Sequence, residues 1–414
     1  MHHGVTTSVG ICVDSGGRGV HSILSNLEEG ISVCMLSTRW PASSIDESME
    51  ALGIRHVISC RKDLKTRTLE PNVLETKKID HYDLSKVSSQ VGTMIFTSGS
   101  SAQPKAVFHS IRHHLYSAHR VAEELKLGPQ DRWLLSLPLW HVSGISIVFR
   151  CLIAGAEVVI PDSHMPLLES LSQYKITHVS LVSTQLLQVM DTSPPDCLRV
   201  AIVGGGPISH QMIDAARYHG WPILTTYGMT ETSSMVALSD EQSDPRSSGR
   251  VLQGHELMIA SDQEILVRSP SVCSGYLSGS QLKSVVDEDG WYHSGDLGEM
   301  DQSGNLYVLG RKDYMFISGG ENISPEEIQS WINNYPDVLE SIVIPIPDPT
   351  FGHRPVAFIR GPVSMESISE YLAEHLPKFK VPVLYPWPEN VISHLGKYGR
   401  ETFIQLAIDL QEKS

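Results

Sequence analysis

The chain has 414 residues, 41% of them hydrophobic and 19% charged, so it is long enough for about two or three globular domains and too apolar to be disordered. Its net charge of −15 disfavours nucleic acid and anionic membranes as partners, so an anionic substrate would need local donors or a metal ion. Six scattered cysteines without a CxxC pair are typical of reduced thiols in a cytoplasmic protein, and no signal peptide or membrane span is expected.

Short β-rich runs alternate with helical patterns in the first part of the chain. Buried strands are expected at 31–37, 56–60, 177–183, 198–206 and 222–228, and a helix near 43–52. The most apolar stretch, 133–161, is broken by Pro138, His141 and Arg150 and is interpreted as buried strand and helix. This alternation predicts an α/β fold with mostly parallel sheets covered by helices.

The second half of the chain has a different texture, in which antiparallel hairpins precede a smaller α+β unit. The first helix of that unit should begin with Ser324 as N-cap, Pro325 in the first helical position and Glu327 closing a capping box. The sequence therefore predicts a large N-terminal body with a β-rich part, residues 1–312, and a small C-terminal domain, residues 313–414.

Residues 97–105, TSGSSAQPK, combine small and hydroxylated residues before a Pro-Lys pair. Apolar residues recur at three- and four-residue spacing from Val107 to Leu125, so a helix is expected directly after this loop, with Pro104 near its first turn. The N–H groups at a helix N-terminus favour an anion, and Lys105 adds a positive charge. The P-loop and GxGxxG motifs are both absent, so the loop alone could equally be a plain surface turn.

His109 and His113 stand four residues apart on the expected helix and could share a metal ion. No HExxH pattern and no third ligand accompany them in the sequence. Solvated helix histidines are therefore the favoured interpretation.

Four further stretches place polar and charged residues beside glycines. They are TTYGMTET (225–232) with Glu231, GWYHSGDLG (290–298) with Asp296 in a turn, GRKDYMFISGGENISPEEI (310–328) with Arg311 and Asp313, and HLGKYGR (394–400) with Lys397. Each alone fits a strand end, a hairpin, a linker or a surface loop. Their order along one chain is much harder to obtain by chance.

In this order the motifs resemble those of the adenylate-forming superfamily of acyl-CoA synthetases, adenylation domains and luciferases. Within it, the chain is most similar to the o-succinylbenzoate–CoA ligases of menaquinone biosynthesis, in the stretches DRWLLSLPLWHVSGISIVFRCLIAGAEVVI, HVSLVSTQLLQVM, GYLSGSQLKSVVDEDGWYHSGDLGEM and FGHRPVAFI. The resemblance implies an AMP-forming ligase that uses ATP, Mg²⁺ and CoA. A carboxylate first attacks the α-phosphate of ATP, and the CoA thiol then displaces AMP.

The resemblance also assigns roles to individual residues. The ATP phosphates would be bound by Thr97, Ser98, Gly99, Ser100, Ser101 and Lys105. The rest of the nucleotide would be contacted by Tyr227 at adenine, Thr230 at the α-phosphate, and Asp296 and Arg311 at the ribose. Glu231 is the implied Mg²⁺ ligand, and Lys397 is the implied catalytic cation of the first step. Asp313 matches the hinge of a mobile C-terminal domain, and Ser318, Gly319 and Gly320 match the turn that enters the site for the CoA step.

The chemistry agrees with these roles. Attack of one anion on another needs charge neutralisation in the transition state, which a lysine and Mg²⁺ supply. A carboxylate suits a ribose because it accepts hydrogen bonds from two hydroxyl groups. The acyl pocket is implied only by position in the family, at His141, Ser143, Gly144, Ser183, Thr184, Gln185, Gly204, Gly205 and Gly206.

Two departures from the family pattern set limits to the resemblance. Ser101 and Ala102 stand where Thr and Gly are usual, and because alanine does not readily adopt a positive φ, a different loop shape is expected. The short start predicts that an edge of the N-terminal subdomain is missing. Three alternatives stay open: another aryl- or acyl-CoA ligase, a non-catalytic nucleotide-binding relative, and an adenylating protein that loads a carrier protein. Whether the chain forms a homo-oligomer also stays open.

Overall fold

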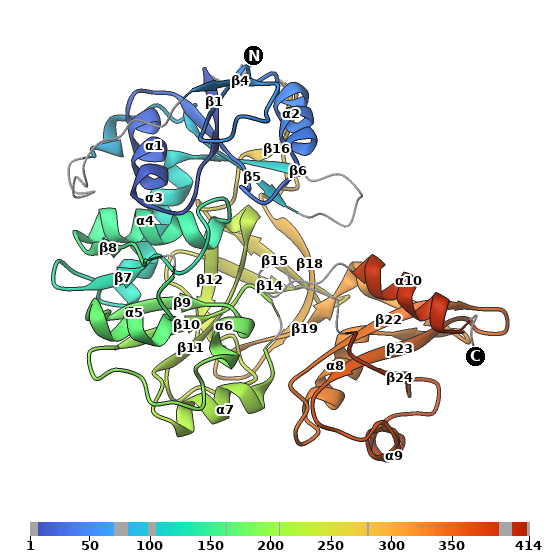
Figure 1. Ribbon diagram of the computed structural model, residues 1–414. Helices are drawn as coiled ribbons and strands as arrows, with labels where there is room; N and C mark the ends of the chain where they lie inside the picture. Colours follow the sequence, from blue (N-terminus) through green and yellow to red (C-terminus); the bar gives the residue numbers. More distant parts are fainter. Residues whose placement is uncertain are drawn as a thin grey trace.

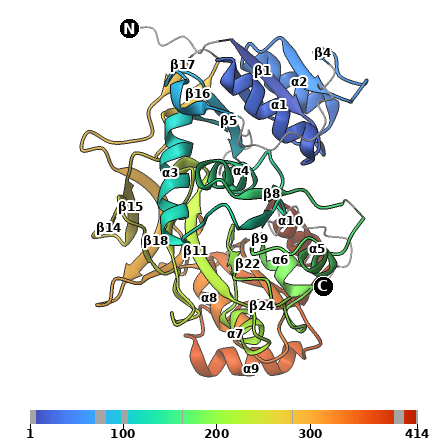
Figure 2. The ribbon, with the colours of Figure 1, turned by 90° about the vertical axis from the view of Figure 1, so that its left-hand side faces the viewer.

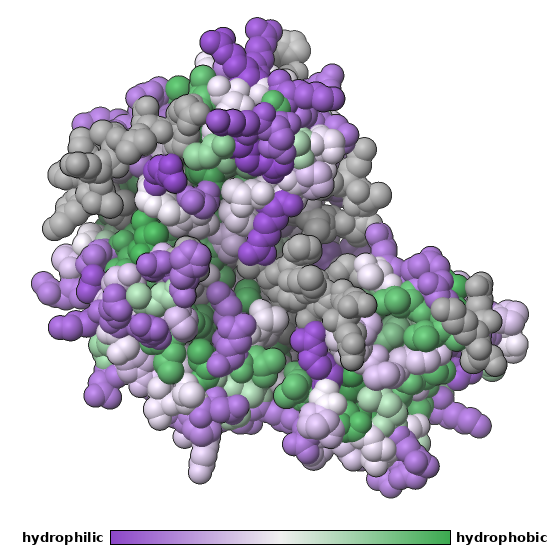
Figure 3. Space-filling view, in the orientation of Figure 1, coloured by the Kyte–Doolittle hydropathy of each residue, from purple (hydrophilic) through white to green (hydrophobic). Residues whose placement is uncertain are grey.

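The computed structural model describes residues 7–69, 82–97, 105–162, 164–206, 208–279, 281–388 and 400–411. A large body holds the blue-to-yellow part of the chain, and a small C-terminal domain, coloured orange to red, projects from its side (Figure 1). Figure 3 shows the same outline in space-filling form, with hydrophilic and hydrophobic side chains interspersed over this face. No helix in the described ranges is both long and apolar enough to cross a membrane.

The first sheet of the body has eight strands in the order β17-β16-β6-β5-β2-β1-β3-β4. Its strands are β1 (Ser8–Cys12), β2 (Ser32–Met35), β3 (His56–Ser59), β4 (Arg67–Leu69), β5 (Gly92–Thr97), β6 (Lys105–Ser110), β16 (Gly275–Ser278) and β17 (Gln281–Lys283). The first five pair in parallel, whereas β6, β16 and β17 continue the sheet by antiparallel pairing. Helices α1 (Gly17–Glu28) and α2 (Ala42–Ala51) connect the early strands, as the alternating pattern predicted.

The second sheet has seven strands in the order β13-β12-β11-β10-β9-β7-β8. Its strands are β7 (Arg132–Leu134), β8 (Glu157–Val159), β9 (His178–Leu181), β10 (Val200–Val203), β11 (Ile223–Met229), β12 (Ser234–Leu238) and β13 (Arg250–Val251). The connecting helices are α3 (Ile111–Glu124), α4 (Val142–Ala154), α5 (Leu167–Gln173), α6 (Ser183–Leu187) and α7 (His210–Tyr218). The mostly parallel pairing confirms the predicted α/β class.

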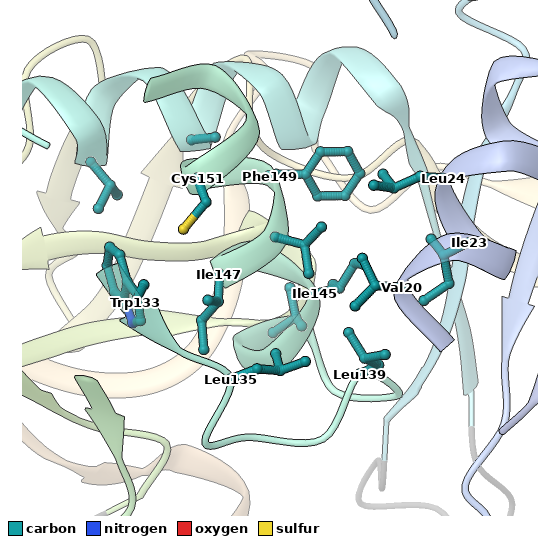
Figure 4. Close-up of a cluster of buried hydrophobic side chains, with 14 of the residues drawn as sticks. Val20, Ile23, Leu24, Trp133, Leu135, Leu139, Ile145, Ile147, Phe149 and Cys151 are labelled. Carbon is teal, nitrogen blue, oxygen red and sulfur yellow. The ribbon is translucent and has the colours of Figure 1, made fainter. Parts of the chain in front are cut away.

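The two sheets share one hydrophobic core, which passes through α3 and α4. Both helices lie side by side in the middle of the body (Figure 2). α4 is apolar almost all round because neighbours surround it: its Phe149 lies beside Leu24 of α1, whereas its Cys151 points to the opposite side, toward Trp133 (Figure 4). The apolar stretch 133–161 is thus buried strand and helix, as predicted.

The β-rich part of the body is a four-stranded antiparallel sheet, which confirms the predicted hairpins. It contains β14 (Glu256–Ile259), β15 (Glu264–Arg268), β18 (Tyr292–Met300) and β19 (Leu306–Arg311). The small domain has a sheet of its own, with β20 (Phe316–Ser318), β21 (Glu321–Ile323), β22 (Glu340–Asp348), β23 (Gly352–Arg360) and β24 (Val383–Pro386). Its helices are α8 (Pro325–Asn333), α9 (Met365–His375) and α10 (Arg400–Gln411).

Helix α8 begins where the sequence predicted, but its cap is only half of a capping box. The Ser324 hydroxyl accepts a hydrogen bond from the Glu327 backbone N–H at 3.5 Å. The Glu327 carboxylate does not close the box, because it pairs with Lys380 Nζ at 2.7 Å. A tertiary ion pair has taken the carboxylate that the local pattern assigned to the cap.

The helix predicted directly after residue 104 begins six residues later than expected. Residues 105–110 form β6, which pairs with β5 from Thr97 opposite Lys105 to Gly92 opposite Ser110. The apolar residues Ala106, Val107 and Phe108 are buried because sheet and helices cover both faces of this strand. The prediction of a helix directly after residue 104 was therefore wrong, and whether the loop lies against a helix N-terminus is outside the described residues.

Candidate active site

Four parallel strands bring the predicted acyl-pocket residues and the motif with Tyr227, Thr230 and Glu231 to one edge of the second sheet. β7, β9, β10 and β11 are neighbours, and their carboxyl ends lie on the same side. His141 follows β7, Gln185 follows β9, Gly204 follows β10, and Tyr227 and Glu231 lie at the end of β11. In open α/β sheets ligands bind outside the carboxyl ends of the strands, so this edge is the natural binding site.

A carboxylate–guanidinium pair joins this edge to the β-rich sheet. Asp296 on β18 lies opposite Arg311 on β19, and their Oδ1 and Nη1 atoms are 2.9 Å apart. The Tyr227 hydroxyl donates to the other carboxylate oxygen of Asp296 at 2.8 Å. Arg311 also reaches Asp313 at 2.9 Å. Burial opposes the shift, but the two carboxylates raise the pKa of Arg311. Asp296 is thus held in a fixed orientation, which suits a ligand with paired hydroxyl groups.

Asp296 and Tyr227 have surroundings that the sequence did not indicate. Asp296 lies within strand β18, so its predicted location in a Gly-flanked turn was wrong. Tyr227 is only 7% exposed and packs in an apolar cluster of the β-rich part. Burial and the charge of Asp296 raise the pKa of Tyr227, so its hydroxyl stays protonated and donates a hydrogen bond to Asp296. Stacking of this ring on adenine stays a prediction.

Thr230 and Glu231 lie in a single 3-10 turn between β11 and β12, η3 (Thr230–Thr232). The Tyr276 hydroxyl, from β16 of the first sheet, donates to Glu231 Oε1 at 2.9 Å, and the Cys273 N–H donates to the Glu231 carbonyl at 2.7 Å. Burial and the charge of Glu231 raise the pKa of Tyr276, so the phenol stays protonated. One carboxylate oxygen of Glu231 carries this bond, which fits a Mg²⁺ site, because Mg²⁺ takes one or two carboxylates and completes its shell with phosphates and water.

The phosphate loop is described only at its two ends. Thr97 closes β5 opposite Lys105, the first residue of β6. Lys105 is exposed, and its Nζ lies 5.2 Å from the centroid of the Tyr276 ring. The same tyrosine therefore contacts the cation of the loop and the carboxylate of η3. Ser98, Gly99, Ser100, Ser101 and Ala102 lie outside the described residues.

Gln185 and His141, in the loops assigned to the acyl pocket, bond to nearby backbone groups. The Gln185 side chain accepts from the Val182 N–H at 3.1 Å and donates to the Ser136 carbonyl at 3.0 Å. His141 is the N-cap residue of α4, and its carbonyl accepts from Gly144 and Ile145 at 3.0 and 3.1 Å. These bonds fix the two loops at the sheet edge. Ser143, Ser183 and Thr184 are partly exposed in the first turns of α4 and α6.

The glycines of these loops serve different purposes. A Cβ on Gly144 would lie 2.0 Å from the Pro138 carbonyl oxygen, so this glycine allows close backbone packing. A Cβ on Gly204 would lie 2.6 Å from the Thr226 methyl, and Gly205 needs its φ of +87°. Gly206 faces open space, with nothing within 4 Å of an added Cβ. Only the last position leaves room for a ligand directly beside the backbone.

The link to the small domain contains the predicted hinge and double-glycine turn. Asp313 lies in a short 3-10 turn, η4 (Lys312–Tyr314), directly after β19. Gly319 and Gly320 connect β20 and β21 with φ of +60° and +91°, the signature of a type I′ hairpin turn. Ser318 before them is buried. Lys397 lies outside the described residues, so its role stays a prediction.

The two histidines that could have shared a metal ion are not the solvated pair expected from sequence. His109 lies on β6 with 0% exposure, and only His113 is in α3, where its Nδ1 accepts from the Ser110 N–H at 3.2 Å. Within the described residues no group of three or more His, Cys, Asp or Glu side chains could hold a metal. The metal interpretation stays disfavoured, while the expectation of solvation was wrong because residues 105–110 form a buried strand.

Tyr276 and His109 supply side-chain contacts to η3 that the sequence did not indicate. Tyr276 and Glu231 are 45 residues apart, and His109 and Thr230 are 121 apart. Both contacts exist because β6 and β16 are neighbours in the first sheet and meet the second sheet at the end of β11. A local pattern carries no such signal, although the Gly-Tyr pair at 275–276 stands close to a motif that was identified.

Comparison with known proteins places this constellation in a family. The chain matches the AMP-binding enzyme family over residues 2–277 and the AMP-binding enzyme C-terminal domain over residues 327–385. It is 39% identical to the 2-succinylbenzoate–CoA ligase of Escherichia coli (strain K12) over 291 residues, 70% of this chain and 63% of that protein. It is 32% identical to the enzyme of the same name from Bacillus subtilis (strain 168) over 397 residues, 91% of this chain and 79% of that one.

Solved structures agree with the sequence relatives. A single-residue variant of Escherichia coli MenE with bound OSB-AMS has a TM-score of 0.84 and 30% identity, covering 97% of this chain and 87% of its own. The o-succinylbenzoate CoA synthetase of Bacillus subtilis with the acyl-adenylate intermediate OSB-AMP has a TM-score of 0.81 and 27% identity, covering 96% and 88%. The same enzyme with ATP and a magnesium ion also has a TM-score of 0.81, with 26% identity over 96% and 89%.

Proposed function

Because this chain belongs to the family of AMP-binding enzymes, we propose that it is an acid–thiol ligase that joins 2-succinylbenzoate to CoA at the expense of ATP, in menaquinone biosynthesis. The reaction has two steps. A carboxylate oxygen of the acid attacks the α-phosphorus, and pyrophosphate leaves. The sulfur of CoA then attacks the acyl carbon, and AMP leaves with the oxygen that bridged the two groups.

One observation supports the proposal: Tyr227 bonds the Asp296–Arg311 pair at the carboxyl edge that also holds the turn of Thr230 and Glu231 and the loops after β7, β9 and β10. In the first step, Asp296 would accept the ribose hydroxyls and Lys105 would face the phosphates. Glu231 would hold Mg²⁺, which when bound offsets phosphate charge. Lys397 would neutralise the carboxylate and α-phosphate as they approach each other.

The CoA step would use the small domain. Arg311 and Asp313 precede a hairpin whose Gly319–Gly320 turn has no Cβ atoms, so a thin pantetheine arm could pass close to its backbone. We place the domain boundary between residues 312 and 313, where β19 has ended and the sheet of the small domain has not begun. Rotation at this point would exchange Lys397 for the glycine turn.

The proposed acyl substrate is 2-succinylbenzoate because the relatives are named 2-succinylbenzoate–CoA ligase and the chain is 39% and 32% identical to two of them. The Gln185 amide oxygen accepts from the Val182 N–H and one of its two N–H groups donates to the Ser136 carbonyl, so at most one N–H is left for the second carboxylate. We also propose that the enzyme acts in the cytoplasm and binds small molecules and no nucleic acid, in keeping with its net charge of −15.

A panel of carboxylic acids with ATP, Mg²⁺ and CoA tests the assignment through AMP release and thioester absorbance. We expect kcat/KM for 2-succinylbenzoate to exceed that for benzoate by about 10⁴, because a site built for a second carboxylate leaves buried donors unpaired when that group is absent. Comparable values for the two acids would move the protein to the general aryl-CoA ligases. No turnover of any acid, with nucleotide still bound, would favour a non-catalytic relative.

A further inference from the structure

The turn that carries Thr230 and Glu231 ends in an unusual backbone. Ser233 has φ of +56° and Ser234 has φ of +106°, although neither is glycine. Such conformations persist only when surrounding contacts hold them, and they concentrate at functional sites. The contacts that hold this turn therefore also decide where its first two residues lie.

His109 contacts the turn with both nitrogens of its ring. Its Nε2 is 2.6 Å from the Thr230 carbonyl oxygen, and its Nδ1 is 2.8 Å from the Ser233 hydroxyl. A carbonyl can only accept, so Nε2 carries the proton. Burial lowers the pKa of His109 to about 3, so the ring is neutral and Nδ1 accepts from the hydroxyl of Ser233. One imidazole thus binds the turn at its beginning and at its strained end.

Side chains from helices α3 and α4 also bond Ser233 and Ser234, the two residues with positive φ. The Ser117 hydroxyl of α3 donates to the Ser233 carbonyl at 3.0 Å. Arg150 of α4 is 1% exposed and donates to the Ser234 hydroxyl at 2.7 Å. These contacts fix Ser233 and Ser234, whereas the bond to the Thr230 carbonyl comes from His109. That bond acts on Thr230, which is assigned to the α-phosphate, whereas the bonds of the Tyr276 hydroxyl and the Cys273 N–H act on Glu231 itself.

We propose that His109 is a positioning residue for adenylation, which orients Thr230 and the Mg²⁺-binding carboxylate of Glu231 through the backbone of η3. This inference rests on the proposed function for the identity of the reaction. The inference goes beyond the proposed function because it assigns His109, which contacts the turn of Thr230 and Glu231, a measurable effect on Mg²⁺ binding. A histidine that merely filled the core would affect stability and nothing else.

Two substitutions separate the two bonds of the ring. His109→Gln keeps an N–H near the position of Nε2 and so can still donate to Thr230. His109→Asn keeps an acceptor near Nδ1 for Ser233 but does not reach Thr230. We expect His109→Asn to raise the Mg²⁺ concentration that half-saturates MgATP binding by about 10- to 100-fold, the usual effect of losing a partner of a metal-binding residue. His109→Gln should recover most of that loss.

Binding is measured by titrating Mg²⁺ against protein and ATP in the absence of any carboxylic acid, so failure of the acyl assignment would leave this test intact. His114→Asn is the matched control, because His114 is 2% exposed and bonds Thr93 at 2.7 Å. It should lower the melting temperature without changing the Mg²⁺ dependence. Equal Mg²⁺ dependence of His109→Asn and His114→Asn would overturn the proposal.

If His109→Asn does not fold, His109→Leu decides the question, because an apolar side chain is readily buried but offers no donor to the Thr230 carbonyl. Its control is Ser233→Gly, which removes only the hydroxyl bonded to Nδ1 and leaves the bond from Nε2 to Thr230 in place. The proposal predicts weaker Mg²⁺ binding in His109→Leu than in Ser233→Gly. Equal Mg²⁺ binding of the two folded variants would contradict it.

Discussion

Replacing Tyr276 by phenylalanine removes one oxygen atom and tests how the two sheets cooperate at the nucleotide site. The hydroxyl donates to Glu231 Oε1 at 2.9 Å, whereas the ring lies under Lys105 Nζ at 5.2 Å and is kept in the variant. A hydrogen bond to a charged group contributes about 1.5–3 kcal/mol, which corresponds to about a 10- to 150-fold change in an equilibrium. We expect the half-saturating Mg²⁺ concentration in ATP–pyrophosphate exchange to rise within that range.

A second variant and a control make the result specific. Tyr276→Leu also removes the ring under Lys105, so it should additionally raise KM for ATP by a few-fold, as expected for an exposed cation–π contact of about 0.5–1 kcal/mol. Tyr116→Phe is the matched control, because the Tyr116 hydroxyl donates to the Gly254 carbonyl at 2.7 Å. If Tyr276→Phe has the same Mg²⁺ dependence as Tyr116→Phe, the tyrosine does not orient Glu231 and the reasoning fails.

Three further outcomes are expected. Lys397→Ala should slow acyl-adenylate formation by about 10²–10³ while sparing thioester formation from supplied acyl-adenylate, and equal slowing of both steps would refute its one-step role. Gly320→Leu should block the CoA step and spare pyrophosphate exchange. Gly320→Ala has the same backbone strain without the bulk, so it should slow the CoA step less. Loss of pyrophosphate exchange in Gly320→Leu would instead show that the turn is structural. Burial lowers the pKa of His109 to about 3 and of His255 to about 4 from the usual 6.5, so the unfolded chain binds more protons at intermediate pH and stability falls as the pH drops through that window. Urea unfolding at pH 5 and pH 7 should show a loss of about 2 kcal/mol per such histidine, which His255→Gln should reduce, and a pH-independent stability would contradict the assignment of neutral rings.

The sheet framework was predictable from the sequence because its signals are local. The strand at 222–228 is a short apolar run that begins after a turn, and the structure has Ile223–Met229 there. The hairpin around Gly319 and Gly320 was indicated by adjacent glycines, which allow positive φ at both central positions. In such cases the residues that determine the conformation are neighbours in the chain.

The strand Lys105–Ser110 shows where local signals mislead. Val107 fits the helical spacing of the residues that follow it, yet its neighbours Ala106 and Phe108 are buried too. A continuous buried run is typical of a strand covered on both faces, and Ser110 with His113 supplies the true helix start. Tertiary pairing with β5 outweighed the weaker preference of the run for helix.

At the site, too, local sequence patterns indicated individual residues but not the tertiary contacts between them. The residues Asp296 and Arg311 were found in separate motifs, but their ion pair depends on the register of β18 and β19. Gln185 was assigned to the substrate pocket, which stays a prediction, and the structure adds its bonds to the backbone of two loops. Sequence patterns named the motifs, and only the three-dimensional pairing showed which described side chains hold the others in place.

The defining step of the proposed reaction is the attack of a carboxylate oxygen of the acid on the α-phosphorus of ATP. The decisive measurement follows the oxygen atoms of 2-succinylbenzoate labelled with heavy oxygen in both carboxylates, during turnover with ATP, Mg²⁺ and CoA. Each AMP released should carry one labelled oxygen from the acid, and pyrophosphate should carry none. Unlabelled AMP with thioester still formed, or label found in a released phosphate, would contradict it.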